Sequence, residues 1–173
     1  MSDQQAGEAK FTIFRACDAP PLVMDQMTGI SDIVAAGTRK LHEAGGIDNG
    51  HDTRVVFEVP GFSLIYGWFK SGYQLLRHSH NADCAYYIVG GSLQMGSEVL
   101  GKGDGFFVPA NVPYAYVAGP KGVEILEFRH HACRDIHVMA DNPAFWDKLV
   151  ASAPENRARW EKEPRPALAE AEG

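Results

Sequence analysis

The sequence lacks the features of a secreted disulfide scaffold or of a membrane protein. Its three cysteines among 173 residues are odd in number and widely spaced, which argues against a disulfide framework and favours a reducing cytoplasm. The longest apolar runs, such as 105–108, are far shorter than the roughly 18–20 residues that a membrane span requires. Residues 1–10 are polar and contain no signal-peptide core. We therefore expect a cytoplasmic protein without a membrane partner.

Basic residues and nucleotide-binding motifs are also scarce. Sixteen Lys and Arg stand against 22 Asp and Glu, which gives a net charge of −6. A chain with this balance has no overall positive charge to neutralise a phosphate backbone, so no nucleic-acid partner is expected. The sequence has no G-x-G-x-x-G, Walker loop, G-x-S-x-G or C-x-x-C, and nucleotide-dependent chemistry and serine hydrolysis lose support accordingly.

What the sequence does contain is an ordinary globular composition, with 45% hydrophobic and 22% charged residues. Its length suits a single domain. From Thr53 to Arg129 the apolar residues recur with a period of two between Gly, Pro and Asn turns, which is typical of short β-strands. Eight such strands would close as a small barrel or jelly roll, an all-β fold. The predicted strands are Val55–Val59, Phe62–Phe69, Tyr73–His80, Cys84–Val89, Ser92–Leu100, Gly105–Val108, Tyr114–Val117 and Val123–Arg129.

Helices are predicted on either side of this β region. Apolar residues between Ile30 and Leu41 recur near a period of 3.6, although Gly37 disfavours a helix interior. Asn142 and Pro143 resemble an N-cap followed by a first helical residue, and the helical spacing continues to Val150. Near the N-terminus, 11–14 forms a short β-like patch.

The predicted division of the chain has four parts. An N-terminal extension is expected to pack on the barrel or on a partner subunit, and a Pro-, Ala- and Glu-rich tail is expected to be poorly ordered. The parts are 1–50 for the extension, 51–131 for the barrel, 132–152 for the helical segment and 153–173 for the tail.

The densest chemical signal is the run His78-Ser79-His80. Residues at i and i+2 of a strand point to the same face, so both imidazoles can approach one ion. Two imidazoles suit Zn, Fe, Ni, Cu or Mn, but they are only half of a usual set of protein ligands.

The surroundings of this pair resemble the two signature motifs of the cupin superfamily, over about residues 55–129. The resemblance implies a jelly-roll barrel, in agreement with the strand pattern. The residues that fit the first motif are Gly72, His78, His80, Cys84 and Gly91, and those that fit the second are Gly103, Pro109 and Tyr114.

Three positions depart from the family pattern. Cys84 stands where a metal-binding cupin would carry Glu, Tyr114 stands where it would carry His, and Asn111 replaces a turn Gly. Cys84 could ligate a metal as a thiolate or be a small buried hydrophobic residue. Tyr114 could ligate as a phenolate, donate a hydrogen bond to a bound oxygen, or simply line the cavity with its ring. Asn tolerates the left-handed turn, so the third change is mild.

Other residues extend the candidate site. Tyr86 shares a face with Cys84 and is expected to add a second phenol to the cavity. Either Glu124 or Glu127 could enter the cavity as a base, because the strand alternation does not fix which of them points inward. The remaining histidines without a partner at a useful spacing, His42, His51 and His137, are interpreted as surface residues.

These observations lead to a first hypothesis and two alternatives. The first is a cupin-fold protein that binds a divalent metal (Fe, Zn, Mn or Ni) through His78, His80 and Cys84. It would act on a small organic substrate as a dioxygenase, lyase or isomerase, with Tyr114 or Tyr86 donating a proton or hydrogen bond. The alternatives are a metal-free cupin that binds or senses a small ligand without catalysis, and a metal-free isomerase that uses Tyr and His as acid and base. A homodimer is expected in each case.

Overall fold

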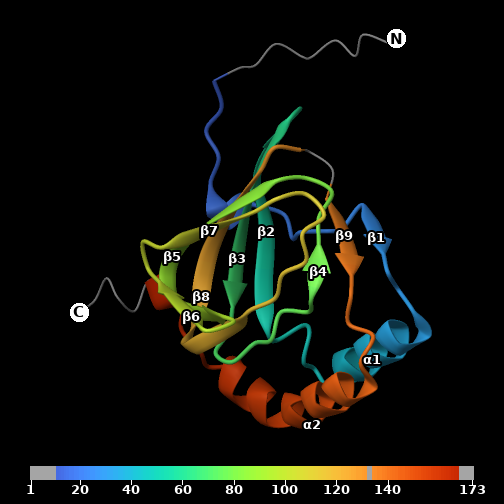
Figure 1. Cartoon of the computed structure of the whole chain (residues 1–173). Helices are drawn as coiled ribbons and strands as arrows, with labels where there is room; N and C mark the ends of the chain where they lie inside the picture. Colours follow the sequence, from blue (N-terminus) through green and yellow to red (C-terminus); the bar gives the residue numbers. More distant parts are fainter. Residues whose placement is uncertain (1–10, 132–133, 168–173) are drawn as a thin grey trace.

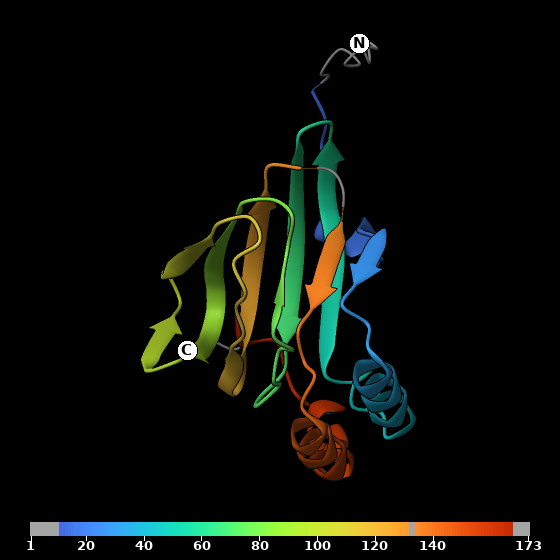
Figure 2. The same ribbon diagram turned by 45° about the vertical axis from the view of Figure 1, so that its right-hand side comes forward.

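Two β-sheets form the body of the molecule, and both helices lie together beyond one end of the strands (Figures 1 and 2). The computed structural model describes residues 11–131 and 134–167. The fold is the all-β jelly roll with flanking helices that the sequence predicts. None of the described helices is long and apolar enough to cross a membrane.

The large sheet carries most of the predicted strands in the order β2-β3-β8-β5-β6, with β7 also paired to β5. All of its named pairings are antiparallel. Its inner face, together with the Tyr114–Tyr116 region, encloses the barrel core. Its strands are β2 (His51–Val59), β3 (Phe62–Phe69), β5 (Cys84–Met95), β6 (Glu98–Gly101), β7 (Gly105–Val108) and β8 (Val117–Arg129).

The small sheet brings together segments that are far apart in the sequence. Its order is β1 (Gln26–Thr28), β9 (Asp135–Val138) and β4 (His78–Ser79). β1 runs parallel to β9, so the N-terminal segment packs directly on the barrel, and β9 is antiparallel to β4. Neither β1 nor β9 was anticipated, because three or four residues are too few to show a period.

Some predicted strands were wrong in extent. The strand predicted over 73–80 is regular only at β4, since its first half makes isolated pairings such as Gln74 with Val117. The strand predicted over 114–117 is likewise reduced to one bridge between Tyr114 and His78, with Val117 already belonging to β8. The patch 11–14 forms no strand; its side chains are exposed, with no buried face to select alternation.

Helix α1 (Asp32–Glu43) confirms the weaker of the two helix predictions. The Ser31 hydroxyl caps it by accepting a hydrogen bond from the Val34 N–H. Gly37, which argued against a helix, is explained by packing: a Cβ built there would lie 2.1 Å from Cδ2 of Trp146 on the second helix. The glycine therefore weakens the helix locally and allows the two helices to approach.

Helix α2 (Pro143–Trp160) begins as predicted, with the Asn142 side chain accepting from the Ala144 N–H and Pro143 in the first turn. It ends later than predicted and includes the first residues, up to Trp160, of the segment assigned to a poorly ordered tail. Burial explains the difference, because Ala153 and Trp160 are buried. The Trp160 indole N–H donates to the Ser71 carbonyl at 2.9 Å. Residues 168–173 of the predicted tail lie outside the described residues.

Candidate functional site

His78 begins β4 and His80 follows its last residue, and both side chains are buried. β4 is fixed on two sides: β9 pairs with it, and His78 exchanges backbone hydrogen bonds with Tyr114 at 3.0 and 3.1 Å. The two imidazole centroids are 4.8 Å apart. The i, i+2 spacing has therefore placed both rings on one face.

The protonation of each imidazole follows from its partners. Nδ1 of His78 is 2.6 Å from the Leu76 carbonyl oxygen, and Nδ1 of His80 is 2.6 Å from the Asp135 carbonyl oxygen. A carbonyl oxygen can only accept, so Nδ1 carries the proton in both rings and each Nε2 keeps its lone pair. Both Nε2 atoms face the Tyr114 hydroxyl, at 2.9 Å from His78 and 3.4 Å from His80.

Burial keeps both imidazoles neutral near pH 7. Burial, with a smaller contribution from the neighbouring His80, lowers the pKa of His78 to about 4. It also lowers the pKa of His80 to about 4, with the Arg129 charge acting in the same direction. Because neither ring carries a charge at pH 7, both offer acceptors rather than donors at Nε2.

The two predicted tyrosines complete a directed chain of hydrogen bonds. The hydroxyl oxygens of Tyr86 and Tyr114 are 2.7 Å apart. Tyr114 has one proton, and the nearer imidazole, His78, can only accept it, so Tyr86 donates to Tyr114 and Tyr114 donates to His78. Burial raises the pKa of both phenols well above its ordinary value, so both remain protonated at neutral pH.

Glu127, not Glu124, faces this cavity. It lies opposite Tyr86 in the β5–β8 pairing, and directly opposed residues share a face. Its carboxylate oxygen Oε1 accepts hydrogen bonds from Arg129 Nη2 at 2.6 Å and from Arg129 Nε at 3.0 Å. Glu124 accepts instead from the Tyr66 hydroxyl at 2.5 Å, away from the histidines.

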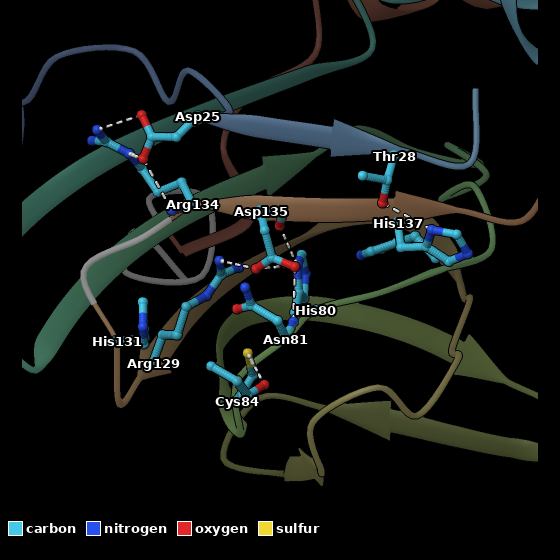
Figure 3. A network of polar contacts seen from close by, with 12 residues as sticks. Asp25, Thr28, His80, Asn81, Cys84, Arg129, His131, Arg134, Asp135 and His137 are labelled. Carbon is cyan, nitrogen blue, oxygen red and sulfur yellow. Dashed lines mark hydrogen bonds and ion pairs between the residues drawn. The ribbon is translucent and has the colours of Figure 1, made fainter.

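A network of polar contacts supports the site from outside (Figure 3). Arg129 is almost fully buried and places Nη1 3.5 Å from the Asp135 carboxylate. The other carboxylate oxygen of Asp135 accepts from the Asn81 N–H at 2.8 Å. The backbone carbonyl of Asp135 also holds His80, so this one residue links β9, β8 and the segment after β4.

Cys84 is buried, but it does not join the histidines. Its Sγ donates to the Ala82 carbonyl at 3.5 Å. Burial, followed by the Glu127 charge, raises the pKa of this thiol to about 12, so it is protonated at neutral pH. It is not among the described residues that line the cavity next to His78 and His80. Its metal-ligand role stays a prediction.

The cavity that the site opens into has a volume of about 180 Å³. Five of the candidate residues line it, namely both histidines, both tyrosines and Glu127. Sequence reasoning missed His51, which was interpreted as a surface residue; this was wrong, since its ring lies against Phe69 and Tyr73 in the cavity wall. Its Nδ1 is buried without a hydrogen-bond partner in the described structure. The other lining residues are mostly apolar and include Leu22, Met24, Ile65, Phe69, Leu75, Leu76, Tyr116, Ile125 and Ile136.

The donor set does not complete a metal site of the kind the resemblance implies. Two imidazole Nε2 atoms converge, as a metal would require, and their Nδ1 atoms are held by carbonyl oxygens. In the described chain, no group of three or more His, Cys, Asp and Glu side chains is placed to hold one ion. The next oxygen is the protonated phenol of Tyr114, a poor ligand unless it is ionised. The residues present therefore do not fit a full Fe, Zn, Mn or Ni shell.

Comparison with known proteins supports the fold. No family model matches the chain, and no curated protein matches it. Among solved structures, the polyketide cyclase RemF from Streptomyces resistomycificus aligns with a TM-score of 0.56 and 14% identity, over 83% of this chain and 99% of that one. An RmlC-like cupin from Shewanella frigidimarina NCIMB 400 is 25% identical (TM-score 0.43; 48% of this chain, 78% of that one). KdgF from Halomonas sp. is 24% identical (TM-score 0.43; 49% and 83%).

The jelly-roll topology and the positions of the two motifs identify the chain as a cupin-fold protein. The turn at Asn111 supports the motif assignment, because its φ of 62° is the left-handed conformation that the family's glycine would adopt. Gly91, the last residue of the first motif, has a φ of 69°.

Proposed function

We propose that this protein binds a small, mostly apolar organic molecule in the barrel cavity and holds it by one oxygen group at Tyr114. The observation that carries the proposal is the position of the Tyr114 hydroxyl, between His78 Nε2 and the Tyr86 hydroxyl in a cavity of about 180 Å³. A buried polar cluster in an apolar wall is the usual way in which a pocket orients a ligand.

The hydrogen-bond directions define the ligand group that fits. Tyr114 can turn its proton from His78 to a ligand oxygen, and Tyr86 continues to support Tyr114 from behind. His80 Nε2 lies 3.4 Å from the Tyr114 oxygen, a long contact, and can accept a hydrogen bond from the ligand instead. A hydroxyl or enol group both accepts and donates, so it satisfies both contacts at once. Oxygenase, lyase or isomerase chemistry on such a ligand stays a prediction of the sequence.

A binding experiment with a simple alcohol tests this proposal. Protein labelled with ¹⁵N in histidine is titrated with 1-butanol, and the NMR shifts of the imidazole nitrogens are followed. We expect Nε2 of His78 and His80 to shift in the wild type and the shifts to be lost in Tyr114→Phe. That variant keeps the ring and its packing but leaves His78 Nε2 and the Tyr86 hydroxyl without their Tyr114 partner, so its free energy of unfolding should fall by about 1–3 kcal/mol.

The matched control is Tyr87→Phe, which removes the same hydroxyl from an exposed tyrosine on the same strand as Tyr86. This control should bind as the wild type does. Equal shifts in wild type and Tyr114→Phe would show that Tyr114 is ordinary packing and would contradict the proposal.

Divalent-metal binding at the histidine pair is the second candidate function. One observation favours it: both Nδ1 atoms donate to carbonyl oxygens, which leaves both Nε2 lone pairs facing the Tyr114 hydroxyl oxygen. Elemental analysis after incubation with Fe(II), Zn, Mn or Ni and removal of free ion tests it. Metal retained by the wild type and lost in the double variant His78→Ala, His80→Ala would support this candidate.

Tyr114→His provides the complementary measurement, because it supplies the residue type that the family motif carries. If the side chain at 114 faces the ion, this variant should retain more metal than the wild type. No retention above background in either protein, with any of the four ions, would exclude this candidate and leave the metal-free proposal.

A further inference from the structure

A second cavity of about 250 Å³ lies between the two helices and the small sheet. Side chains of α1, α2 and β9 form most of its wall, and the apolar ones, Trp160 excepted, belong to a core cluster separate from that of the barrel. The lining is mainly apolar, with Thr38, Gln74 and Asn156 as its main polar side chains. The apolar lining residues include Met27, Ile30, Val34, Leu41, Ile47, Val138, Trp146, Leu149 and Trp160. We call this space the helical chamber.

The helical chamber and the barrel cavity share a wall. Tyr73, Leu76 and Ile136 line both spaces. Leu76 and Ile136 are only partly buried and pack against the helical core cluster. Only single side chains separate the two spaces, and Leu76 and Ile136 are aliphatic. The spaces become one when these side chains change rotamer, a motion that costs little compared with moving the backbone.

The sizes of the two spaces also favour a joint site. Pockets for drug-sized organic ligands occupy roughly 300–1,000 Å³. Neither the barrel cavity, at about 180 Å³, nor the helical chamber, at about 250 Å³, reaches that range alone. Joined, they fall within it.

The polar groups are unequally divided between the two cavities, so the joined space has one polar end and one apolar end. The barrel end holds the two neutral imidazoles and the hydrogen-bonded phenols. The chamber end contains the rings of Trp146 and Trp160, but their indole N–H groups already donate to the carbonyl oxygens of Ala140 and Ser71. The chamber therefore offers apolar contact and little hydrogen bonding.

We propose that the barrel cavity and the helical chamber form one binding site for an elongated ligand with an oxygen head and an apolar body. The head lies at Tyr114, and the body passes Leu76 and Ile136 to lie between α1 and α2. This inference rests on the proposed function for the position of the head, and it adds the class of ligand: a long-chain or extended apolar molecule rather than a compact one.

A series of 1-alkanols from butanol to decanol tests the inference with two independent signals. Histidine ¹⁵N shifts report the head. Tryptophan fluorescence reports the chamber when Trp68→Phe is the background, since the two remaining tryptophans both line the chamber and Trp68 lines neither space. We expect affinity to rise by about fourfold for each added methylene that becomes buried. The fluorescence should respond only to the longer members.

A variant that fills the chamber supplies the decisive comparison. Thr38→Phe places a ring in the chamber from α1, and Ala35→Phe adds the same ring on the exposed side of that helix. In Thr38→Phe the gain in affinity should stop at a shorter chain, while 1-butanol still shifts the histidines. Ala35→Phe should match the background protein. Thr38→Leu, a smaller filling variant, serves the same purpose if Thr38→Phe does not fold.

Failure of the inference can be distinguished from failure of the proposed function. If affinity does not rise with chain length, or rises equally in the Thr38 variants, the two spaces are not one site and the inference is overturned. Histidine shifts with 1-butanol that depend on Tyr114 would still support the proposed function in that case. If the long alkanols change the fluorescence without any histidine shift, the head does not lie at Tyr114, and both the inference and the proposed function are overturned. No binding by any alkanol also overturns both.

Discussion

At the residue scale, burial separates the two histidines of the candidate site from the surface histidine His42. His78 and His80 are 4% and 5% exposed, whereas the side chain of His42 is 63% exposed and pairs with Asp48 at the surface. The two buried imidazoles make their hydrogen bonds to two carbonyl oxygens and one phenol hydroxyl of the protein. Such an environment favours the neutral ring, and protonation within it requires a charge to be buried.

This difference predicts how stability depends on pH. In the unfolded chain a histidine titrates near its ordinary pKa of 6.5, but His78 and His80 titrate at about 4 in the folded protein. Between these values the unfolded state binds more protons than the folded state, so the free energy of unfolding falls as pH falls. We expect the Tm to decrease progressively from about pH 6.5 to pH 4, measured by thermal denaturation at constant ionic strength.

The double variant His78→Gln, His80→Gln should lose much of this slope, although it will be less stable at pH 7 than the wild type. His42→Gln, an exposed substitution, should keep the slope. If the double variant retains the full pH dependence between pH 6.5 and 4, other groups cause it and the buried histidines are not held neutral.

At the scale of elements, the contact between α1 and α2 is set by one missing methyl group. A Cβ at Gly37 would lie 2.1–2.5 Å from three ring atoms of Trp146, well inside van der Waals contact. Trp146 cannot easily retreat, because it is 3% exposed and its indole N–H donates to the Ala140 carbonyl at 2.8 Å. Close packing of the two helices therefore explains why a glycine, a poor helix former, stands inside α1.

Gly37→Ala should accordingly destabilise the protein, even though alanine is the better helix former by about 1 kcal/mol. Overpacking of a core contact costs about 1–3 kcal/mol, and the short distances put this contact near the upper end. We expect a net loss of about 1–2 kcal/mol in chemical denaturation. In a Trp146→Leu background the same substitution should become neutral or stabilising, since the ring that it meets is gone. Additive effects of the two substitutions would rule out this explanation.

The sequence predicted much of the barrel, because alternation and turn residues are local signals. It also placed His78 and His80 on one face and assigned Tyr86 to the inward side of its strand. It could not choose between Glu124 and Glu127, since that choice depends on the register between β5 and β8, which pairs residues about 40 apart. A cross-strand partner is not visible in either strand alone.

His51 was missed for a different reason. The predicted strand region began at Thr53, whereas β2 begins at His51 itself. Extending the alternation by two residues would have put His51 on the same face as Thr53, and both line the barrel cavity.

The end of α2 was missed for another reason. The sequence there contains Ala and Pro and has only a weak helical period. Burial of Ala153 and Trp160, a tertiary effect, extends the helix beyond the predicted end.

At the scale of the whole molecule, the N-terminal segment exposes several large apolar side chains. Phe11, Ile13 and Val23 are all exposed, although Phe14 contacts Phe57 of β2. This segment precedes β1, whose parallel pairing with β9 ties the chain to the barrel next to the candidate site. Exposed apolar side chains in one stretch are typical of a surface that is covered by a partner.

The homodimer expected from the sequence stays a prediction, and this segment is where we expect its interface. Light scattering at micromolar concentration should give about twice the 18.9 kDa of one chain. The double variant Phe11→Ser, Ile13→Ser should shift the protein toward the monomer, because burial of these side chains would stabilise the dimer by roughly 1.5–3 kcal/mol each. Val99→Ser with Phe107→Ser removes exposed apolar side chains from β6 and β7 and should leave the dimer intact. A wild type that is monomeric would refute the dimer, and loss of the dimer only in the β6–β7 variant would move the interface to the outer face of the large sheet.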